Sequence, residues 1–320
     1  MKNKKLLVPV VIAFLLLVVI GLIIGGVAKS VGNSSKDASA SAGIENFDRK
    51  PRRPSVLCLS PSFVEMMYRI NREDHITAVT DGCDFPSDAK SLPNLGSSLK
   101  LDWKLVEKLP IDVVLLLPNH SIEHAKFLGM GKKVIEGRVD SINSICDTMW
   151  AVGQLYNEED FIEQWIMDLD LSLTVLKKKA AMRDARGDAA PKVLVVLNHN
   201  DDFSGEILVS GLKLFYSDVV KKAGGENAFQ SAVETASISF AELVALEPDI
   251  IIDIASPVGI MDRHEYVSKK TQEWRTMLEK ASTSEKQIKV EVFAESWARR
   301  PGPRVVELLN NVGKVIFDDN

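Results

Sequence analysis

Residues 105–115 read LVEKLPIDVVL, and residues 243–252 repeat the same pattern as LVALEPDIII. Each copy has the pattern of a helix end, a turn that contains proline and aspartate, and a buried strand. Proline cannot continue a helix, and the apolar run after it suits a strand covered on both faces. The two prolines, Pro110 and Pro248, lie 138 positions apart, about the length of one domain. We therefore expect two similar α/β lobes that hold a ligand between them.

The N-terminus does not belong to these lobes. Residues 1–5 are basic, and Leu6–Val27 is an uncharged, almost wholly apolar run of 22 residues, long enough to span a bilayer as a helix. The lysines before this run predict that everything after Lys29 lies outside the cytoplasm. We expect residues 1–29 to be a transmembrane anchor and residues 30–53, which are small and polar, to be a flexible tether. A cleaved signal segment is the alternative.

Composition limits the partners. The chain of 320 residues is 46% hydrophobic, which is enough for two packed cores, and its net charge is −5. Residues 1–43 carry five lysines and one aspartate, so the rest of the chain carries about −9, which argues against nucleic acid as a partner. The three cysteines are Cys58, Cys83 and Cys146. They form no CxxC pair, and we expect them to be small core residues. The alternative is that two of them form a disulfide, and the sequence does not say which two.

From Pro54 onward, segments with the pattern of strands alternate with segments that have the pattern of helices. This alternation predicts parallel sheets with helices on their faces. The first series has strands at 55–59, 76–80, 112–117 and 133–135, and helices at 63–70, 123–128 and 141–155. The second series has strands at 192–197, 207–210, 249–252 and 288–293, and helices at 213–223 and 303–315.

Between the two series, Glu158 to about Arg186 shows helical periodicity without glycine or proline. A helix of this length reaches about 42 Å at 1.5 Å per residue, which is long for one lobe. The predicted fold class is therefore α/β, with two lobes that each contain a parallel sheet flanked by helices and are joined by one long helix. The expected boundaries are 54–156 for the N-terminal lobe, 157–187 for the interlobe helix and 188–320 for the C-terminal lobe.

Several short stretches carry a family resemblance. In the first lobe they are residues 56–62, VLCLSPS, with Glu65 behind them, and residues 78–86, AVTDGCDFP. In the second lobe they are residues 208–211, 223–229, 239–243 and 300–304, which read LVSG, AGGENAF, SFAEL and RPGPR. In this order and spacing, the stretches resemble the class III substrate-binding proteins of ABC importers, which include the binding proteins for cobalamin, ferric siderophores and haem. The resemblance extends from Pro54 to Phe317.

The resemblance implies two lobes, a rigid helix between them and a shallow cleft in which the ligand lies at the carboxyl ends of the strands. It implies no catalytic residue, no cofactor and no resident metal. Applied to this sequence, it predicts ligand contacts from Ser60, Ser62, Asp84, Phe85, Ser97, His120, His199, Trp297, Arg299 and Arg300. Other polar residues at such strand ends are Ser98, Asn119, Asn198, Asn200, Ser210 and Ser256.

Two groups of these candidates suggest the chemistry of the ligand. An aromatic face at Trp297 with the guanidinium groups of Arg299 and Arg300 suits a large, partly anionic, planar ligand, by stacking and bidentate hydrogen bonds. The alternative is a tryptophan that packs the lobe beside two solvated arginines. His120 and His199 each follow a strand, so they could face each other and take an iron-bearing ligand such as haem. The alternative is two histidines in surface loops.

The resemblance also predicts how the protein docks to a membrane permease. In cobalamin and siderophore binders, each lobe carries an exposed glutamate just before the repeated helix, and this glutamate binds arginines of the permease. The alignment places Trp103 and Ala241 at these positions, with Asp102 and Glu242 beside them. The resemblance therefore assigns docking to Asp102 and Glu242, although a neighbour on a helix points about 100° away.

The sequence contains no Gly-x-Ser-x-Gly elbow, no phosphate-binding Gly-x4-Gly-Lys loop and no His-Glu-x-x-His zinc helix. We therefore expect a binding protein and not an enzyme. The predicted function is the extracytoplasmic, membrane-anchored and monomeric solute-binding component of an ABC import system, which captures an iron chelate, haem or a corrinoid and delivers it to a permease. The alternative is an anchored receptor of the same fold that does not dock to a permease.

Overall fold

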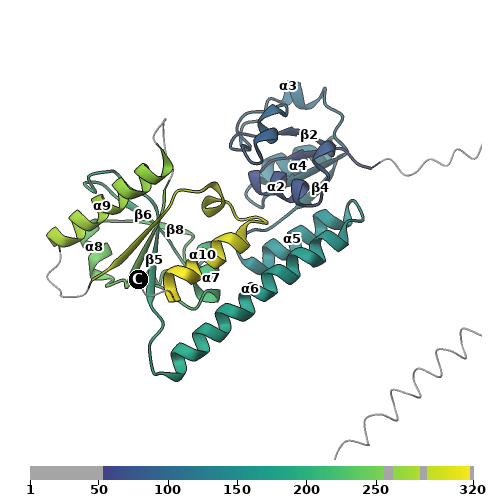
Figure 1. The fold of residues 1–320 in the computed structure, drawn as a ribbon. Coiled ribbons are helices and arrows are strands. Elements are labelled where there is room, and N and C mark those ends of the chain that lie inside the picture. The colour runs from purple at the N-terminus through teal and green to yellow at the C-terminus, as the bar shows by residue number, and fades with distance from the viewer. Residues whose placement is uncertain (1–52, 256–261, 282–286, 318–320) are drawn as a thin grey trace, which may run out of the picture. The chain divides into compact units, whose positions relative to one another are not determined.

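The computed structural model describes residues 53–255, 262–281 and 287–317. These residues form two β-sheets with helices packed around them (Figure 1). The predicted anchor at 1–29, most of the predicted tether at 30–53 and the candidate Ser256 lie outside the described residues. Within the described ranges, no helix is long and apolar enough to cross a membrane.

The first sheet has four parallel strands in the order β2-β1-β3-β4, as the alternation predicts. Its strands are β1 (Val56–Cys58), β2 (Ile76–Val79), β3 (Val113–Leu116) and β4 (Lys133–Glu136). Every residue of β1 and β3 is buried, which explains why these two strands read as continuous apolar runs. The helices of this half are α2 (Pro61–Arg69), α3 (Trp103–Val106) and α4 (Ser121–Gly129).

The second sheet is mixed, so the prediction of a wholly parallel second sheet is wrong. Its order is β10-β9-β5-β6-β8. The short strand β7 pairs in parallel with Lys192 and Val193 at the start of β5, and β6 pairs with the end of β5. Only eight residues, 199–206, join β5 (Lys192–Asn198) to β6 (Ile207–Ser210). A parallel return needs a crossover of a dozen or more residues, so β6 returns antiparallel to β5, and β8 pairs antiparallel to β6.

The other strands of this sheet are β7 (Glu226–Asn227), β8 (Thr235–Ile238), β9 (Ile250–Ile254) and β10 (Lys289–Phe293). The helices of this half are α7 (Phe215–Lys222), α8 (Phe240–Ala245), α9 (Arg263–Ala281) and α10 (Val305–Phe317). Sequence reasoning missed β8 and α9. Most side chains of α9 are polar, and only Lys270 and Trp274 are buried, so the helix has little apolar periodicity.

The repeated sequence makes the same hydrogen bond in both sheets. In the first copy, Oδ2 of Asp112 accepts a hydrogen bond from the backbone N–H of Ser55 over 2.8 Å, at the start of β1. In the second copy, Oδ2 of Asp249 accepts one from the backbone N–H of Lys192 over 2.7 Å, at the start of β5. Both pairs are 57 positions apart in the sequence. The aspartate that follows each proline therefore fixes the first strand of its sheet.

Two long helices lie in sequence between the sheets. They are α5 (Ile142–Gln154) and α6 (Glu159–Ala185), and α6 is continuous over 27 residues, as the periodicity predicts (Figure 1). Glycines let the neighbouring helices approach α6 closely. A Cβ atom at Gly313 of α10 would lie 2.2 Å from Leu176, and one at Gly153 of α5 would lie 2.7 Å from Ile162.

The three cysteines are free thiols. Cys58 and Cys83 are buried, and Cys146 is half-buried. Burial raises the pKa of all three thiols, so they stay protonated at neutral pH and act as small apolar residues.

Candidate functional site

The loop after β2 supplies two of the candidates from the first sheet. Residues 81–85 turn away from the sheet at Gly82, whose φ of +82° favours glycine. Asp84 is exposed, and Phe85 is 38% exposed. Both side chains are therefore accessible at the carboxyl end of the parallel sheet, where α/β folds hold ligands.

The candidates from the second sheet follow β10 on a short 3₁₀ turn, η3 (Ser296–Arg299). Trp297 is half-buried and packs on Phe293, with 5.4 Å between the ring centroids. Arg299 is exposed. The tryptophan thus packs the turn and leaves part of its ring accessible, while Arg299 faces solvent.

Arg300 joins these two groups of candidates. Its Nη2 donates to the carbonyl oxygen of Gly82 over 2.9 Å and to the carboxylate of Asp84. Its Nη1 lies 3.6 Å from Oε1 of Glu65. The loop after β2 and the segment after β10 are therefore in direct contact, although 218 positions separate Gly82 from Arg300.

Glu65 of α2 carries a buried negative charge, since its side chain is only 2% exposed. Arg304 neutralises this charge with a bidentate pair, from Nε to Oε2 over 2.8 Å and from Nη2 to Oε1 over 2.6 Å. Nη1 of Arg304 donates to the hydroxyl of Ser296 over 2.9 Å, and the guanidinium lies 3.7 Å from the ring centroid of Phe85. We call the four charged residues Glu65, Asp84, Arg300 and Arg304 the arginine clamp.

Ser60 and Ser62, which the sequence predicts as ligand contacts, are both buried. Ser60 is the N-cap of α2, and its hydroxyl accepts a hydrogen bond from the backbone N–H of Ser62 over 3.3 Å. Gly302 packs against the backbone of Ser62. In this structure Ser60 caps the helix and Ser62 packs against Gly302, and their role as ligand contacts stays a prediction.

Other candidates at the strand ends differ in exposure. The hydroxyl of Ser97 accepts a hydrogen bond from the backbone N–H of Leu99 over 3.4 Å, and Ser97 itself is exposed. Ser210 is wholly buried, and its hydroxyl donates to the carbonyl oxygen of Gly211. The remaining exposed candidates are Asn119, Asn198 and Asn200.

His120 is a buried residue at the N-terminus of α4, and only 2% of it is exposed. Its Nδ1 lies 3.2 Å from the carbonyl oxygen of Leu117. Its Nε2 is buried and has no hydrogen-bond partner among the described residues. His120 is therefore not the surface-loop histidine that the alternative reading of the sequence proposed.

His199 is buried in the second sheet, and its side chain is 4% exposed. Its Nε2 lies 3.0 Å from Oδ2 of Asp253, which also accepts a hydrogen bond from the indole N–H of Trp274 over 2.9 Å. Its Nδ1 lies 2.8 Å from the carbonyl oxygen of Asn200, and its ring stacks on Phe203 at 4.4 Å. Both ring nitrogens of His199 are engaged within its own half of the molecule, so a role for His199 and His120 in holding a ligand stays a prediction.

The pKa of His199 lies above its ordinary value. Burial acts to lower the pKa, but the hydrogen bond and the negative charge of Asp253 outweigh this effect. When His199 is protonated, it forms a buried ion pair with Asp253, which joins the end of β5 to β9. Sequence reasoning missed Asp253, although a single aspartate in the apolar strand Ile250–Ile254 needs a buried partner.

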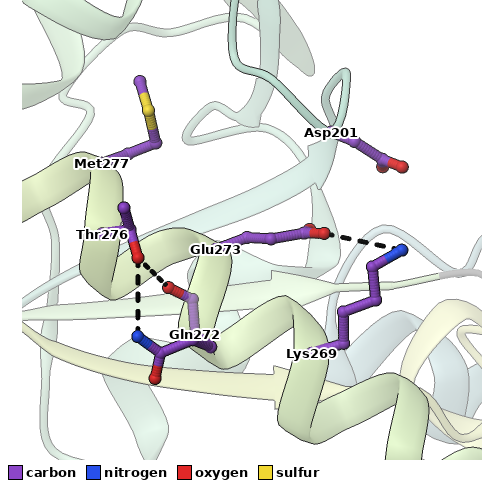
Figure 2. Close-up of a pocket in the computed structure, with 6 residues that line it drawn as sticks. All are labelled: Asp201, Lys269, Gln272, Glu273, Thr276 and Met277. Atoms are coloured by element: carbon purple, nitrogen blue, oxygen red, sulfur yellow. Dashed lines mark hydrogen bonds and ion pairs between the residues drawn. The ribbon is translucent and has the colours of Figure 1, made fainter.

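A shallow pocket of about 360 Å³ lies against α9 (Figure 2). Its lining residues are Asp201, Lys269, Gln272, Glu273, Thr276 and Met277. The charged groups there already pair with one another, since Lys269 lies 3.7 Å from Glu273, and Lys270 binds Asp201. We therefore do not assign the main ligand to this pocket.

The two carboxylates assigned to docking are exposed and cap their own helices. Oδ1 of Asp102 accepts hydrogen bonds from the first backbone N–H groups of α3, at Lys104 and Leu105. Glu242 forms a capping box with Ser239 at the start of α8, and the hydrogen bonds from Ser239 lower the pKa of its carboxyl. Trp103, at the expected glutamate position, is half-buried under Lys126, whose Nζ lies 3.6 Å from the ring centroid.

Comparison with known proteins places this geometry in context. Residues 56–269 match the family model described as periplasmic binding protein. No curated protein matches the chain.

Several solved structures share the fold. The vitamin B12 binding protein BtuF of Vibrio cholerae has a TM-score of 0.66 and 19% sequence identity, over 83% of this chain and 98% of that chain. The periplasmic heme-binding protein BhuT, solved with two hemes, gives the same four values. An ABC transporter substrate-binding protein from Listeria monocytogenes EGD-e has a TM-score of 0.65 and 20% identity, over 84% of this chain and all of that chain.

The buried charge of Glu65 leads to a stability prediction. Glu65→Gln should lower the free energy of unfolding by about 3–5 kcal/mol, because it leaves the buried guanidinium of Arg304 without a counter-charge. Asp140→Asn, which breaks the exposed pair of Asp140 with Arg138, should lower it far less. Urea denaturation of the full chain measures both values. The double variant Glu65→Met with Arg304→Met should be more stable than Glu65→Gln alone, and equal losses from Glu65→Gln and Asp140→Asn would contradict the role of the clamp.

The ion pair of His199 leads to a pH prediction. A raised pKa in the folded state means that the pair stabilises the fold fully below the ordinary histidine pKa of about 6.5 and that this contribution is lost as the pH rises through the raised value. His199→Gln should lower the free energy of unfolding by about 3 kcal/mol at low pH and should flatten its dependence on pH. The exposed His264→Gln is the control and should leave both the stability and the slope unchanged. Denaturation at a series of pH values tests this, and an identical slope in His199→Gln and the wild type would refute it.

Proposed function

Because this chain belongs to the periplasmic binding protein family, we propose that it captures a bulky iron chelate, haem or a corrinoid outside the cytoplasm and delivers it to a permease of an ABC importer. Members of this family bind solutes and are not enzymes, and the same holds for this chain. The ligand class is supported by the shared fold with the binding proteins for vitamin B12 and heme. The proposed location is the outer face of the cell membrane, with Leu6–Val27 as the anchor.

The observation that carries this proposal is the contact between the loop after β2 and the segment after β10. It gathers two guanidinium groups, from Arg300 and Arg304, and the accessible ring of Phe85 at the carboxyl ends of the strands. The exposed Arg299 follows the same strand end. A large, planar ligand with carboxylate or phosphate groups would find an aromatic surface and charged donors there.

We propose that capture uses the exposed part of this region and leaves its buried part intact. Nη2 of Arg300 binds both a backbone carbonyl and the exposed Asp84, and a ligand carboxylate would take the place of Asp84 there. Arg304 is held by the buried Glu65 and is expected to keep that bond. Because α6 is one continuous helix, small rocking of the two halves is favoured over a wide hinge motion.

The ligand class can be tested directly. Absorbance and intact mass of the protein as purified report any retained ligand and whether residues 1–29 are still present. Titration with haem, cobalamin and ferric siderophores should then give saturable binding of at least one of them. Arg299→Gln and Phe85→Ala should each weaken an anionic planar ligand by about tenfold, since each removes one contact worth about 1.4 kcal/mol.

Arg138→Gln removes an exposed positive charge elsewhere and is the matched control for Arg299→Gln. It should leave the affinity unchanged. Saturable binding of none of the three ligands at micromolar concentration would refute the ligand class, and equal effects of Arg138→Gln and Arg299→Gln would refute the site.

A second candidate is an anchored receptor that does not dock to a permease, which is favoured by Trp103 and the exposed Ala241 at the expected glutamate positions. If the importer role is right, the double variant Asp102→Asn with Glu242→Gln should lose co-purification with a permease from solubilised membranes. Asparagine still caps a helix and glutamine still completes a capping box, so this variant removes the charges and keeps both helix starts. Glu107→Gln, on the exposed end of α3, is the control.

Absence of any permease from the wild-type preparation, with and without ligand, would favour the receptor. A permease that still co-purifies with the double variant would place docking on other residues.

A further inference from the structure

Helix α6 has a second apolar face. Met167, Leu171, Val175 and Met182 are each between 48% and 66% exposed. At 3.6 residues per turn they fall within an arc of about 80° and extend along about 22 Å of the helix. The core-facing residues of α6, such as Trp165 and Leu176, lie on the other side of the helix. We call the four exposed residues the outer stripe.

A single exposed apolar side chain on a folded protein needs no explanation, but a continuous row of four along one helix marks an interaction surface. The row follows the i, i+4 spacing of a helix-packing seam at Met167, Leu171 and Val175, and Met182 continues it two turns later. The stripe therefore has the dimensions of a contact with another helix.

The charges of α6 are separated along its length. Residues 159–170 contain five acidic and no basic residues, whereas residues 171–185 contain four basic residues and one acidic residue. Alignment with the helix macrodipole accounts for such charges only in the first and last turns. Asp168 pairs with Arg69 of α2 at 3.8 Å. Asp170 lies beyond the first turn, and Lys177 and Lys178 lie before the last turn, so the macrodipole does not explain the placement of these three residues.

We propose that the outer stripe is the interface of a homodimer in which two copies of α6 pack antiparallel. In an antiparallel pair, the acidic half of one helix faces the basic half of the other, whereas a parallel pair would bring like charges together. An antiparallel pair also has a two-fold axis, which uses the same surface on both copies and closes the assembly at two chains. This proposal does not depend on the identity of the ligand.

A two-fold axis between Thr174 and Val175 gives a consistent register. It sets Met167 opposite Met182 of the second copy, and Leu171 opposite Lys178 of the second copy. The aliphatic stem of a lysine can cover leucine while its charged end reaches solvent. Each copy would thus bury its stripe against the stripe of the other.

Charge complementarity selects a second copy over the other possible occupants. The apolar segment Leu6–Val27 is uncharged, so it offers no charge that complements either half of α6. A membrane surface with anionic lipids would repel the acidic half. Sequence reasoning alone predicted a monomer, because the stripe becomes visible only when the structure shows which face of α6 is buried.

The test uses the full chain in detergent and sedimentation velocity over a concentration range of roughly 1 to 100 µM. The wild type should associate reversibly to a dimer. Leu171→Asp places a charge at the centre of the stripe and should weaken the dimer at least about tenfold. Since Leu171 is exposed, this change should leave the circular dichroism spectrum and the melting temperature unchanged.

Two charge-reversal variants test the antiparallel arrangement. One carries Glu163→Lys with Asp170→Lys, which reduces the net charge of residues 159–170 from −5 to −1. The other carries Lys177→Glu with Lys178→Glu, which changes the net charge of residues 171–185 from +3 to −1. Each variant alone should dimerise more weakly than the wild type. An equimolar mixture should favour the heterodimer, because the acidic first half of the second variant then faces the basic second half of the first.

A wild type that stays monomeric over the whole range would overturn the proposal. Association that survives Leu171→Asp would also overturn it and would assign self-association to the N-terminal apolar segment. Failure of the mixture to form a heterodimer would exclude the antiparallel arrangement, and binding of the protein's stripe to anionic vesicles, lost in Leu171→Asp, would assign the stripe to lipid instead.

Discussion

The buried carboxylate of Glu65 is the constraint on which the candidate site depends. A carboxylate removed from water is costly unless a charged partner and hydrogen bonds replace the water, and Arg304 supplies both from 239 positions away. Arg300 adds a second positive charge at 3.6 Å. The segment after β10 therefore cannot separate from α2 without leaving a buried charge unpaired. This constraint fixes the positions of Arg299 and Phe85 in the candidate site.

The fold was predictable as far as it follows from local pattern. Proline next to an aspartate before an apolar run indicates the same unit twice, and in the structure Asp112 and Asp249 each bind the start of the first strand of their sheet. The direction of β6 was not predictable from apolar content, because it depends on how few residues join β5 to β6. Helix α9 was not predicted because most of its side chains are polar and its one buried apolar side chain is Trp274.

The sequence predicts where the candidate residues lie in the fold, but it does not predict which side chains they bind. Strand ends identify Asp84 and Arg300, because the carboxyl ends of strands in one sheet meet at one edge. The partner of each group depends on tertiary contacts, as His199 shows. Its place after β5 suggested a ligand, but Asp253 in the neighbouring strand β9 needs a buried donor and takes its imidazole. An isolated aspartate in an apolar strand was the available signal, and it indicates a structural partner more strongly than an adjacent histidine indicates a ligand.

Helix α6 is apolar on two sides because it meets two different requirements. Its inner side must pack closely against α5 and α10, where Gly153 and Gly313 leave no room for a Cβ atom. Its outer stripe contributes nothing to that packing, so folding alone gives no reason for it to be apolar. A continuous helix resists bending, and rocking of the two halves is expected to occur at its ends. Self-association through the middle of α6 is therefore compatible with ligand capture, because the stripe lies on the part of the molecule that changes least.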